Sequence, residues 1–358
     1  MDFPLFEKIV TAGLEKQLHL GVQLSLANDE RQVDVAFGEV RAGVPLSPGD
    51  SLSWLSACKP ITAVAILQLV DQGKFSLDTP LNLLLPQFRY GPAGEVTIFQ
   101  ILTHTSPLEE FSTGWPAADW IQVLDSIAHH PLKNPWDDET DAAYLPSVSW
   151  FILGAILEQA TGQDYSHGVQ NQVLLPAGMT QTTAAGSKRE VTLYDRVSGK
   201  LESSAYQNRL NARQPSPGSS FCGPARDLCR FYEQLRLSQA GKAGGLLSAA
   251  LMKEMTQRWR KDRFDQTLQH KVDYGLGVII NSSRYGSETV PYGYGENASE
   301  GAFGHGGSQC SIGFTDPERG RSIVIIANGR PGEGQHQRRF RQLLAALDED
   351  LQNLPEWS

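Results

Sequence analysis

The sequence has few cysteines, no long apolar run and no excess of positive charge. Its four cysteines show neither the spacing of a metal site nor the density of a disulfide-stabilised scaffold, so we expect reduced, mostly buried thiols at Cys58, Cys222, Cys229 and Cys310. No apolar run reaches the roughly 18 residues that span a bilayer. The formal net charge of −9 argues against a nucleic-acid partner. We therefore expect neither a membrane nor a nucleic acid as a partner.

The sequence also lacks an export signal and a set of residues spaced for a metal. Residues 1–20 have no basic n-region followed by an apolar stretch, and their apolar spacing predicts an amphipathic helix, so we expect a cytoplasmic protein. His129 and His130 are adjacent, which points them about 100° apart on a helix, and no carboxylate is spaced to complete a site. We expect no metal and no cofactor. The basic clusters at residues 258–263 and 338–341 are predicted to be solvated faces of helices.

Strand patterns occur at both ends of the 358-residue chain, and helical patterns dominate between them. We therefore predict an α/β fold in which residues 1–75 and 225–358 form a sheet domain and residues 76–224 a mainly helical domain. A ligand site at the seam between two such domains is the default expectation. Expected strands lie at residues 21–27, 32–37, 274–280, 309–315 and 322–328, and expected helices at residues 6–19, 56–71, 96–102, 120–128, 150–161, 225–239 and 335–351.

Ser56 and Lys59 are three residues apart at the start of a strongly helical pattern. Pro60 is tolerated only in a first helical turn, so it fixes the helix start near Ser56 and directs unpaired N–H groups there. An i,i+3 spacing places the lysine on the face of the serine, and apolar neighbours would desolvate the amine and lower its pKa from about 10.4. The pair suits a nucleophile and its general base. An N-capping serine followed by an exposed lysine fits the residues equally well.

Six segments occur in order along the chain: SACKPITAVAILQLVDQGKFSLDTPLNLLLPQF (56–88), TIFQILTHTS (97–106), LLPAGMTQTT (174–183), GPARDLCRFYEQL (223–235), YGLGVII (274–280) and FGHGGSQCSIGFTDPERG (303–320). Together they resemble the serine β-lactamase and penicillin-binding-protein superfamily, closest to the branch that holds class C β-lactamases and family VIII carboxylesterases. The resemblance covers almost the whole chain and favours the nucleophile interpretation of Ser56. It implies a β-lactamase-like fold, an antiparallel sheet flanked by helices plus an α-helical domain.

The resemblance implies a catalytic tyrosine, which in this superfamily belongs to a Y-x-N motif. Tyr144, in AAYLPSVSWFILGAILEQATG, is the candidate for relaying protons. The third motif position is Pro146 rather than asparagine, so either Ser147 replaces the missing side-chain contact or no residue does. Tyr144 could instead be a buried aromatic side chain whose hydroxyl is bonded locally.

The resemblance also implies a counterpart of the K-T-G motif that lines one side of the site. His305, Gly306 and Gly307 occupy that place and are expected to bind substrate. Paired glycines let a substrate approach a strand edge closely, although they also suit a flexible turn. The backbone N–H groups of Ser56 and Ser308 are implied to form an oxyanion hole. We further hypothesise that a positively charged His305 helps to keep the catalytic tyrosine ionised.

These residues predict a serine hydrolase that forms an acyl-Ser56 intermediate on a small-molecule ester or amide, most like a carboxylesterase. Penicillin-active relatives use the lysine and threonine of K-T-G, which His305 and Gly306 replace, so β-lactamase activity is less favoured. The residues also fit a biosynthetic transacylase that hands the acyl group to an amine or alcohol, a D-stereospecific amidase or aminopeptidase, and a non-catalytic acyl-binding sensor. The loop at residues 284–301 is predicted to border the site. Arg330 could contact a substrate carboxylate, but the prediction that it lies on the surface is favoured. The natural substrate and the oligomeric state are not specified by these residues.

Overall fold

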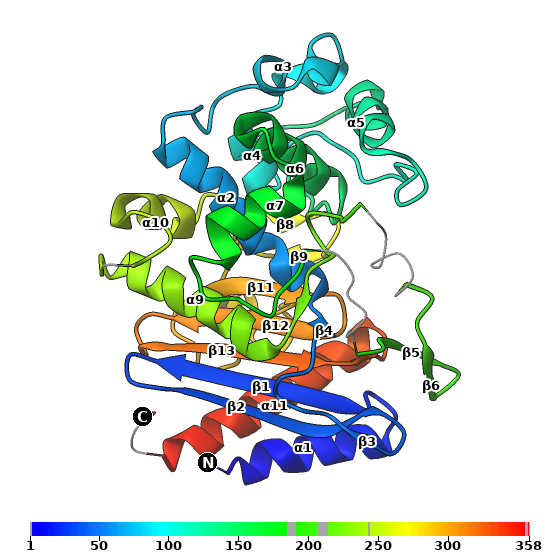
Figure 1. Ribbon diagram of the computed structural model, residues 1–358, viewed down its shortest axis with the longest axis vertical. Coiled ribbons are helices and arrows are strands. Elements are labelled where there is room, and N and C mark those ends of the chain that lie inside the picture. Colours follow the sequence, from blue (N-terminus) through cyan, green and yellow to red (C-terminus); the bar gives the residue numbers. More distant parts are fainter. Residues whose placement is uncertain (1, 185–190, 207–213, 243, 355–356, 358) are drawn as a thin grey trace.

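A seven-stranded antiparallel sheet is the centre of the fold (Figure 1). The computed structural model describes residues 2–184, 191–206, 214–242, 244–354 and 357. The strand order is β10-β11-β12-β13-β1-β2-β3, and Val22 of β1 lies opposite Ala327 of β13, so the two ends of the chain complete one sheet. The strands are β1 (Gly21–Asn28), β2 (Gln32–Arg41), β3 (Val44–Pro45), β10 (Ile279–Ile280), β11 (Phe303–Gly307), β12 (Ser311–Asp316) and β13 (Arg321–Ala327).

Helices cover both faces of this sheet (Figure 1). Helices α1 (Pro4–Glu15) and α11 (Glu333–Gln352) pack together on one face, and α9 (Ala225–Gln239) packs against β1, β12 and β13 on the other. Successive side chains of a strand point to opposite faces. In β13, accordingly, Ile325 belongs to the core under α1 and α11, whereas Val324 and Ile326 belong to the core under α9.

On the side of α9 that faces away from the sheet, further helices form a layer around α2 (Lys59–Asp71). Residues 59–67 of α2 are all buried. The helix carries apolar side chains around its whole circumference, so neighbouring elements have to cover all of it. It packs against α6 (Val148–Thr161). Among the described residues, the other helices are α3 (Leu81–Leu84), α4 (Ile98–Thr103), α5 (Trp120–His129), α7 (Tyr165–Val169) and α10 (Ala249–Thr256), with short helical turns η1 (Leu55–Cys58), η2 (Pro86–Phe88), η3 (Pro92–Glu95), η4 (Gln170–Leu174) and η5 (Ser283–Tyr285).

Short strand pairs connect the two layers around the start of α2. Strand β4 (Leu52–Ser53) pairs with β7 (Cys222–Gly223), which fixes the segment just before Ser56. The hairpin of β8 (Phe264–Asp265) and β9 (His270–Lys271) lies beside residue 142, through a bridge between Ala142 and Asp265. A third group, β5 (Tyr194–Val197), β6 (Lys200–Ser203) and β14 (Gly329–Arg330), forms a small separate sheet.

Some local predictions from the sequence agree with the structure and others differ. Helix α9 begins and ends at the predicted residues. The predicted strand at residues 274–280 is reduced to β10, because Gly277 adopts a left-handed φ of +74° that an extended strand does not allow. Ser56 lies in the turn η1, and the helix itself begins at Lys59. The domain boundaries predicted near residues 75 and 225 stay a prediction.

The basic cluster at residues 258–263 is not the solvated helix face that the sequence predicts, and the cluster at residues 338–341 is one only in part, because Arg338 is exposed and Arg339 is buried. Residues 258–263 are not helical, and Arg260 is fully buried with its guanidinium 2.8 Å from the carboxylate of Asp265. Residues 338–341 do lie in a helix, α11, but Arg339 is buried and donates hydrogen bonds to three backbone carbonyls. These arginines are structural, because a buried cation must be paired or hydrogen-bonded. None of the described helices is both long and apolar enough to cross a membrane.

Candidate active site

Ser56 lies in η1, where the sheet meets the buried helix α2. The preceding residue, Leu55, adopts a left-handed φ of 50°, a conformation that costs a non-glycine residue about 1–2 kcal/mol. Contacts of Trp54 oppose that cost: its indole donates to the Gly223 carbonyl at 2.8 Å, and its own carbonyl accepts from the Ser311 hydroxyl at 2.6 Å. Tertiary contacts therefore hold Ser56 in a turn that local preference alone would not choose.

Lys59 is fully buried and reaches the hydroxyl of Ser56. Its Nζ lies 2.9 Å from Ser56 Oγ, 2.8 Å from the carbonyl oxygen of Pro146 and 2.9 Å from that of Gly218. Burial lowers the pKa of the amine from its ordinary value of 10.5 to about 8. Carbonyl oxygens can only accept hydrogen bonds, so the two N–H groups of the neutral amine point at them. The lone pair of neutral Lys59 then points at Ser56.

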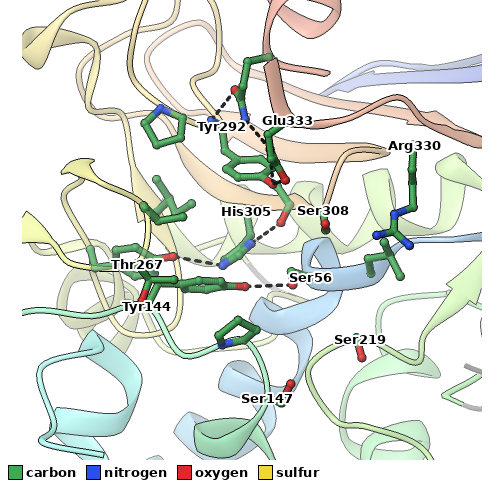
Figure 2. Close-up of a pocket in the computed structure, with 18 of the residues that line it drawn as sticks. Ser56, Tyr144, Ser147, Ser219, Thr267, Tyr292, His305, Ser308, Arg330 and Glu333 are labelled. Atoms are coloured by element: carbon green, nitrogen blue, oxygen red, sulfur yellow. Dashed lines mark hydrogen bonds between the residues drawn. The ribbon is translucent and has the colours of Figure 1, made fainter. Parts of the chain in front are cut away.

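Tyr144 meets Ser56 from another side, and its hydroxyl donates to Ser56 Oγ at 2.9 Å (Figure 2). Its backbone is held on both sides by His104, whose carbonyl accepts from Ala143 N–H at 3.1 Å and whose Nδ1 accepts from Leu145 N–H at 3.2 Å. Burial raises the pKa of the tyrosine well above its ordinary value of 10. The resting side chain is therefore a neutral phenol, not the ionised form that the sequence-based hypothesis requires.

A buried carboxylate, that of Asp265 in strand β8, also holds the backbone around Tyr144. Asp265 accepts the N–H of Tyr144 at 3.0 Å and the N–H groups of Thr267 and Leu268 at 2.8 Å each. Its partner Arg260 stacks over the ring of Tyr274, with 4.2 Å between the guanidinium carbon and the ring centroid. Both members of the ion pair are fully buried. This pair links the tyrosine segment to the wall of the site.

His305 is buried and neutral, which contradicts the hypothesis of a charged histidine. Burial, assisted by the positive charge of Lys59, lowers its pKa to about 3. Its Nδ1 lies 2.7 Å from the carbonyl oxygen of Gly306, so this nitrogen carries the proton and donates. Its Nε2 lies 3.4 Å from the hydroxyl of Tyr274, and its ring centroid lies 5.8 Å from that of Tyr144. The side chain that meets Nε2 of His305 is thus Tyr274, rather than Tyr144.

The glycines after His305 allow a close fit on both faces of β11. A Cβ on Gly306 would lie 2.1 Å from the ring of Tyr292, and a Cβ on Gly307 would lie 2.1 Å from the carbonyl oxygen of Trp54. A side chain at Gly307 would push β11 away from the start of η1, and a side chain at Gly306 would displace Tyr292. Within the described residues, no backbone carbonyl accepts a hydrogen bond from the N–H of Ser56 or Ser308, and both residues line the same cavity.

The cavity in front of Ser56 has a volume of about 560 Å³ (Figure 2). Its wall is largely aromatic and aliphatic and includes Tyr274, Leu268 and Tyr292. Tyr292 comes from the loop at residues 284–301, so the prediction that this loop borders the site is confirmed. Among the described residues, no cluster of three or more histidine, cysteine, aspartate or glutamate side chains is arranged to hold a metal ion.

At the edge of this cavity, one point that the sequence left open is decided and one prediction needs correction. Pro146 occupies the position of the motif asparagine, and its backbone carbonyl contacts Lys59. Among the described residues, the Ser147 side chain makes no hydrogen bond to Ser56, Lys59 or Tyr144, so it does not replace the motif asparagine there. Arg330, predicted to lie on the surface, lines the cavity and is only 19% exposed in its side chain.

The sequence analysis missed several residues of the site. Asp265 lies outside every segment that we singled out, Arg260 belongs to the basic cluster that was predicted to be solvated, and Tyr274 opens the YGLGVII segment, which predicts a strand and not a contact with His305. All three reach the site through long-range contacts. His104 carried a signal, because it belongs to the THTS segment of the resemblance, but that segment predicts a turn and not a contact with Tyr144.

Comparison with known proteins decides the family. The family described as Beta-lactamase matches residues 6–348. The chain belongs to the β-lactamase family. Its relatives include the esterase EstB of Burkholderia gladioli, 32% identical over 330 residues, which cover 80% of this chain and 79% of that protein. A match to penicillin-binding protein 4* of Bacillus subtilis, 27% identical, covers 41% of this chain but only 33% of that longer protein.

Solved structures agree with the β-lactamase-like fold. EstCE1, described as a hydrolase with promiscuous acyltransferase activity, has a TM-score of 0.81 at 20% identity, with 96% of this chain and 97% of that chain covered. A D-amino acid amidase of Ochrobactrum anthropi has a TM-score of 0.76 at 20% identity, over 97% of this chain and 98% of that chain. The predicted fold class is therefore confirmed, and the chain is a serine hydrolase of the β-lactamase and penicillin-binding-protein type.

Proposed function

We propose that this protein hydrolyses small-molecule carboxylic esters through an acyl-enzyme formed on Ser56. The observation that carries the proposal is the set of partners of Lys59. Two of its three neighbours are carbonyl oxygens, which leaves the lone pair of the neutral amine directed at the Ser56 hydroxyl, 2.9 Å away. A buried amine with a lowered pKa is the kind of base that this step requires.

The first half of the reaction acylates the enzyme. Lys59 accepts the proton of Ser56 as Oγ bonds to the carbonyl carbon, and the negative charge develops on the carbonyl oxygen. The N–H groups of Ser56 and Ser308 stabilise that oxyanion, and a single donor of this kind is typically worth about 2.7–4 kcal/mol. The bond to the leaving group then breaks. Tyr144 donates its proton to the departing oxygen and is reprotonated from Lys59.

The second half returns the enzyme to its starting state. A water molecule attacks the acyl carbon, and its proton passes to the base formed by Lys59 and Tyr144. The ester bond to Ser56 Oγ breaks, the serine recovers its proton, and the carboxylic acid leaves. His305 and Gly306 of β11 form part of the wall of the cavity that receives the substrate.

An ester is favoured over a β-lactam for two reasons. His305 is neutral and Gly306 has no hydroxyl, so this edge offers neither the fixed charge nor the hydroxyl expected near a β-lactam carboxylate. The relative EstB, which matches 80% of the chain, is an esterase. Acyl transfer to an alcohol or amine is the second candidate, because a cavity of about 560 Å³ leaves room for an acceptor beside a small acyl group.

Active-site labelling and turnover test the proposal together. We expect a fluorophosphonate to modify Ser56, p-nitrophenyl butyrate to be hydrolysed, and Ser56→Ala to abolish both. Hydrolysis that persists in Ser56→Ala would refute the assignment of the nucleophile, and labelling without turnover would instead favour an acyl-binding sensor. Nitrocefin hydrolysis at a rate comparable with ester hydrolysis would favour a β-lactamase. Acyl transfer would be recognised by products with added alcohols or amines at the expense of hydrolysis.

A further inference from the structure

The turn that connects β11 to β12 carries Ser308 beside the nucleophile. This turn spans residues 307–310, and the N–H of Cys310 closes it by donating to the carbonyl of Gly307 at 3.1 Å. We call it the oxyanion turn. Within the described residues, no backbone carbonyl accepts the N–H of Ser308, and Ser308 lines the cavity in front of Ser56 (Figure 2). The direction of that N–H is therefore set by the contacts that hold the turn.

Gln309, the residue after Ser308, has a backbone conformation that is unfavourable for any residue with a side chain. Its φ is +57°, in the left-handed region that favours glycine. Leu55, the residue before Ser56, has the same kind of strain, with a φ of +50°. Such strain persists only where the surroundings enforce it, and it concentrates at functional sites. Each of the two expected oxyanion donors thus has a strained neighbour.

Two hydrogen bonds attach Gln309 to helix α11. Its side-chain Oε1 accepts the N–H of Gly332, the residue just before the helix, at 2.7 Å. Its backbone carbonyl accepts a hydrogen bond from Nη2 of Arg339, in the second turn of the helix, at 2.9 Å. Arg339 is buried and is itself fixed, because it also donates to the carbonyls of Leu18 at 2.7 Å and Gly329 at 3.1 Å. The same helix therefore holds both the side chain and the backbone of Gln309.

These bonds give a reason for a glutamine at a position where glycine would be less strained. We propose that Gln309 is a positioning residue of the oxyanion hole, and that its attachment to α11 aims the N–H of Ser308 at the carbonyl oxygen of the substrate. Gln309 does not line the cavity, so it acts through Ser308. This inference rests on the proposed function, because it requires the oxyanion that forms when Ser56 is acylated.

Two substitutions separate positioning from stability. Gln309→Met keeps the length of the side chain and the strained backbone, but it has no oxygen to accept the N–H of Gly332. Gln309→Gly loses the same bond and also removes the strain. The glycine variant should therefore have the higher melting temperature of the two, while both lose activity alike. We expect kcat/KM for p-nitrophenyl butyrate to fall about tenfold, because complete loss of one oxyanion donor costs about 10²–10³ in kcat and a displaced donor costs less.

A boronic acid measures the oxyanion hole separately from folding. As Lys59 takes the proton of Ser56, the serine oxygen adds to boron, and the tetrahedral boronate places an oxygen where the substrate carbonyl becomes an oxyanion. The Ki of 1-butaneboronic acid should therefore rise about tenfold in both Gln309 variants, in step with the loss of kcat/KM. A substitution that merely reduces the amount of folded protein would leave the Ki at its wild-type value.

Gln269→Met is the matched control. Gln269 is also a left-handed glutamine, with a φ of +53°, but its side chain donates to the carbonyl of Gln266 in its own hairpin, and it does not line the cavity. Its kcat/KM and Ki should equal those of the wild type.

An unchanged Ki or an unchanged kcat/KM in either Gln309 variant would overturn the inference, as would an equal loss of activity in the Gln269 variant. A wild-type protein that neither hydrolyses the ester nor is labelled at Ser56 by a fluorophosphonate would instead overturn the proposed function, and the inference with it.

Discussion

The carbonyl oxygen of Gly218 accepts a hydrogen bond from Lys59 at 2.9 Å, and a Cβ added to that glycine would lie 3.0 Å from the same Nζ. Lys59 comes from the start of α2, whereas Gly218 lies 159 residues further along the chain. The contact both orients the lone pair of the amine and contributes to the shape of its buried compartment. Activity should therefore respond to small changes at Gly218 and at the other groups that surround the amine.

Gly218→Ala should reduce activity more than stability. The added methyl group would also lie 2.8 Å from Trp150, so Trp150 or Lys59 has to move. A displacement of about 1 Å at a catalytic group can cost on the order of 100-fold in rate, whereas overpacking costs about 1–3 kcal/mol in folding free energy. We expect kcat/KM for p-nitrophenyl butyrate to fall about 10–100-fold in a folded protein. Gly49→Ala, where the nearest atom is 3.6 Å away, is the control, and equal activity in both variants would contradict the prediction.

The rate of acylation should rise with pH to a plateau above pH 8. Only neutral Lys59 accepts a proton, and burial lowers its pKa to about 8, so the reactive fraction increases about tenfold per pH unit below that value. The rate of fluorophosphonate labelling between pH 5.5 and 10 measures this fraction directly. A plateau that begins only near pH 10.5 would mean that Lys59 is not desolvated, and a rate that falls with rising pH would exclude it as the base.

His305→Gln should leave the shape of that pH profile unchanged. The pKa of His305 is lowered to about 3 by burial, so the imidazole is neutral throughout the range of the measurement. The substitution removes the contact with Tyr274 and is expected to change the size of the rate, not its apparent pKa. Loss of an ionisation between pH 6 and 7 in the variant would show that His305 is charged in the working enzyme.

Asp265→Asn should destabilise the fold strongly and lower turnover. It leaves Arg260 as an unpaired charge in a fully buried site, a change that costs about 3–5 kcal/mol in buried ion pairs. It also loosens the backbone of Tyr144, whose N–H the carboxylate accepts. Denaturant unfolding and kcat are the measurements. Asp262→Asn is the control, because the Asp262 side chain is 58% exposed and its pair with Lys271 is long, at 3.9 Å. Equal stability of the two variants would refute the role of the buried pair.

Short-range patterns allowed the sequence to predict much of the candidate site. Ser56 and Lys59 are three residues apart, so helical geometry alone brings them together once the turn forms. The resemblance placed Tyr144, 88 residues further on, correctly beside Ser56. It did not reveal that Pro146 contributes a backbone carbonyl, because a motif compares side chains and a carbonyl is present at every residue.

The rest of the candidate site depends on contacts that no local pattern encodes. Asp265 bonds the backbone of Tyr144 across 121 residues, and Glu110 meets the start of α6 across 37 residues. The charges of the site residues also depend on contacts between distant segments. A sequence identifies an ionisable group, but burial decides its pKa, and burial makes His305 neutral where the sequence suggests a charge.

The amino-acid order by itself determined the nucleophile candidate, its neighbouring amine and the family fold, because these depend on spacing along one helix and on ordered motifs. Only the tertiary structure decided which atoms surround the amine and that the histidine of H-G-G is uncharged. The physical reason is that desolvation and long-range hydrogen bonds arise only when distant segments pack together, and these set the protonation state on which the proposed chemistry depends.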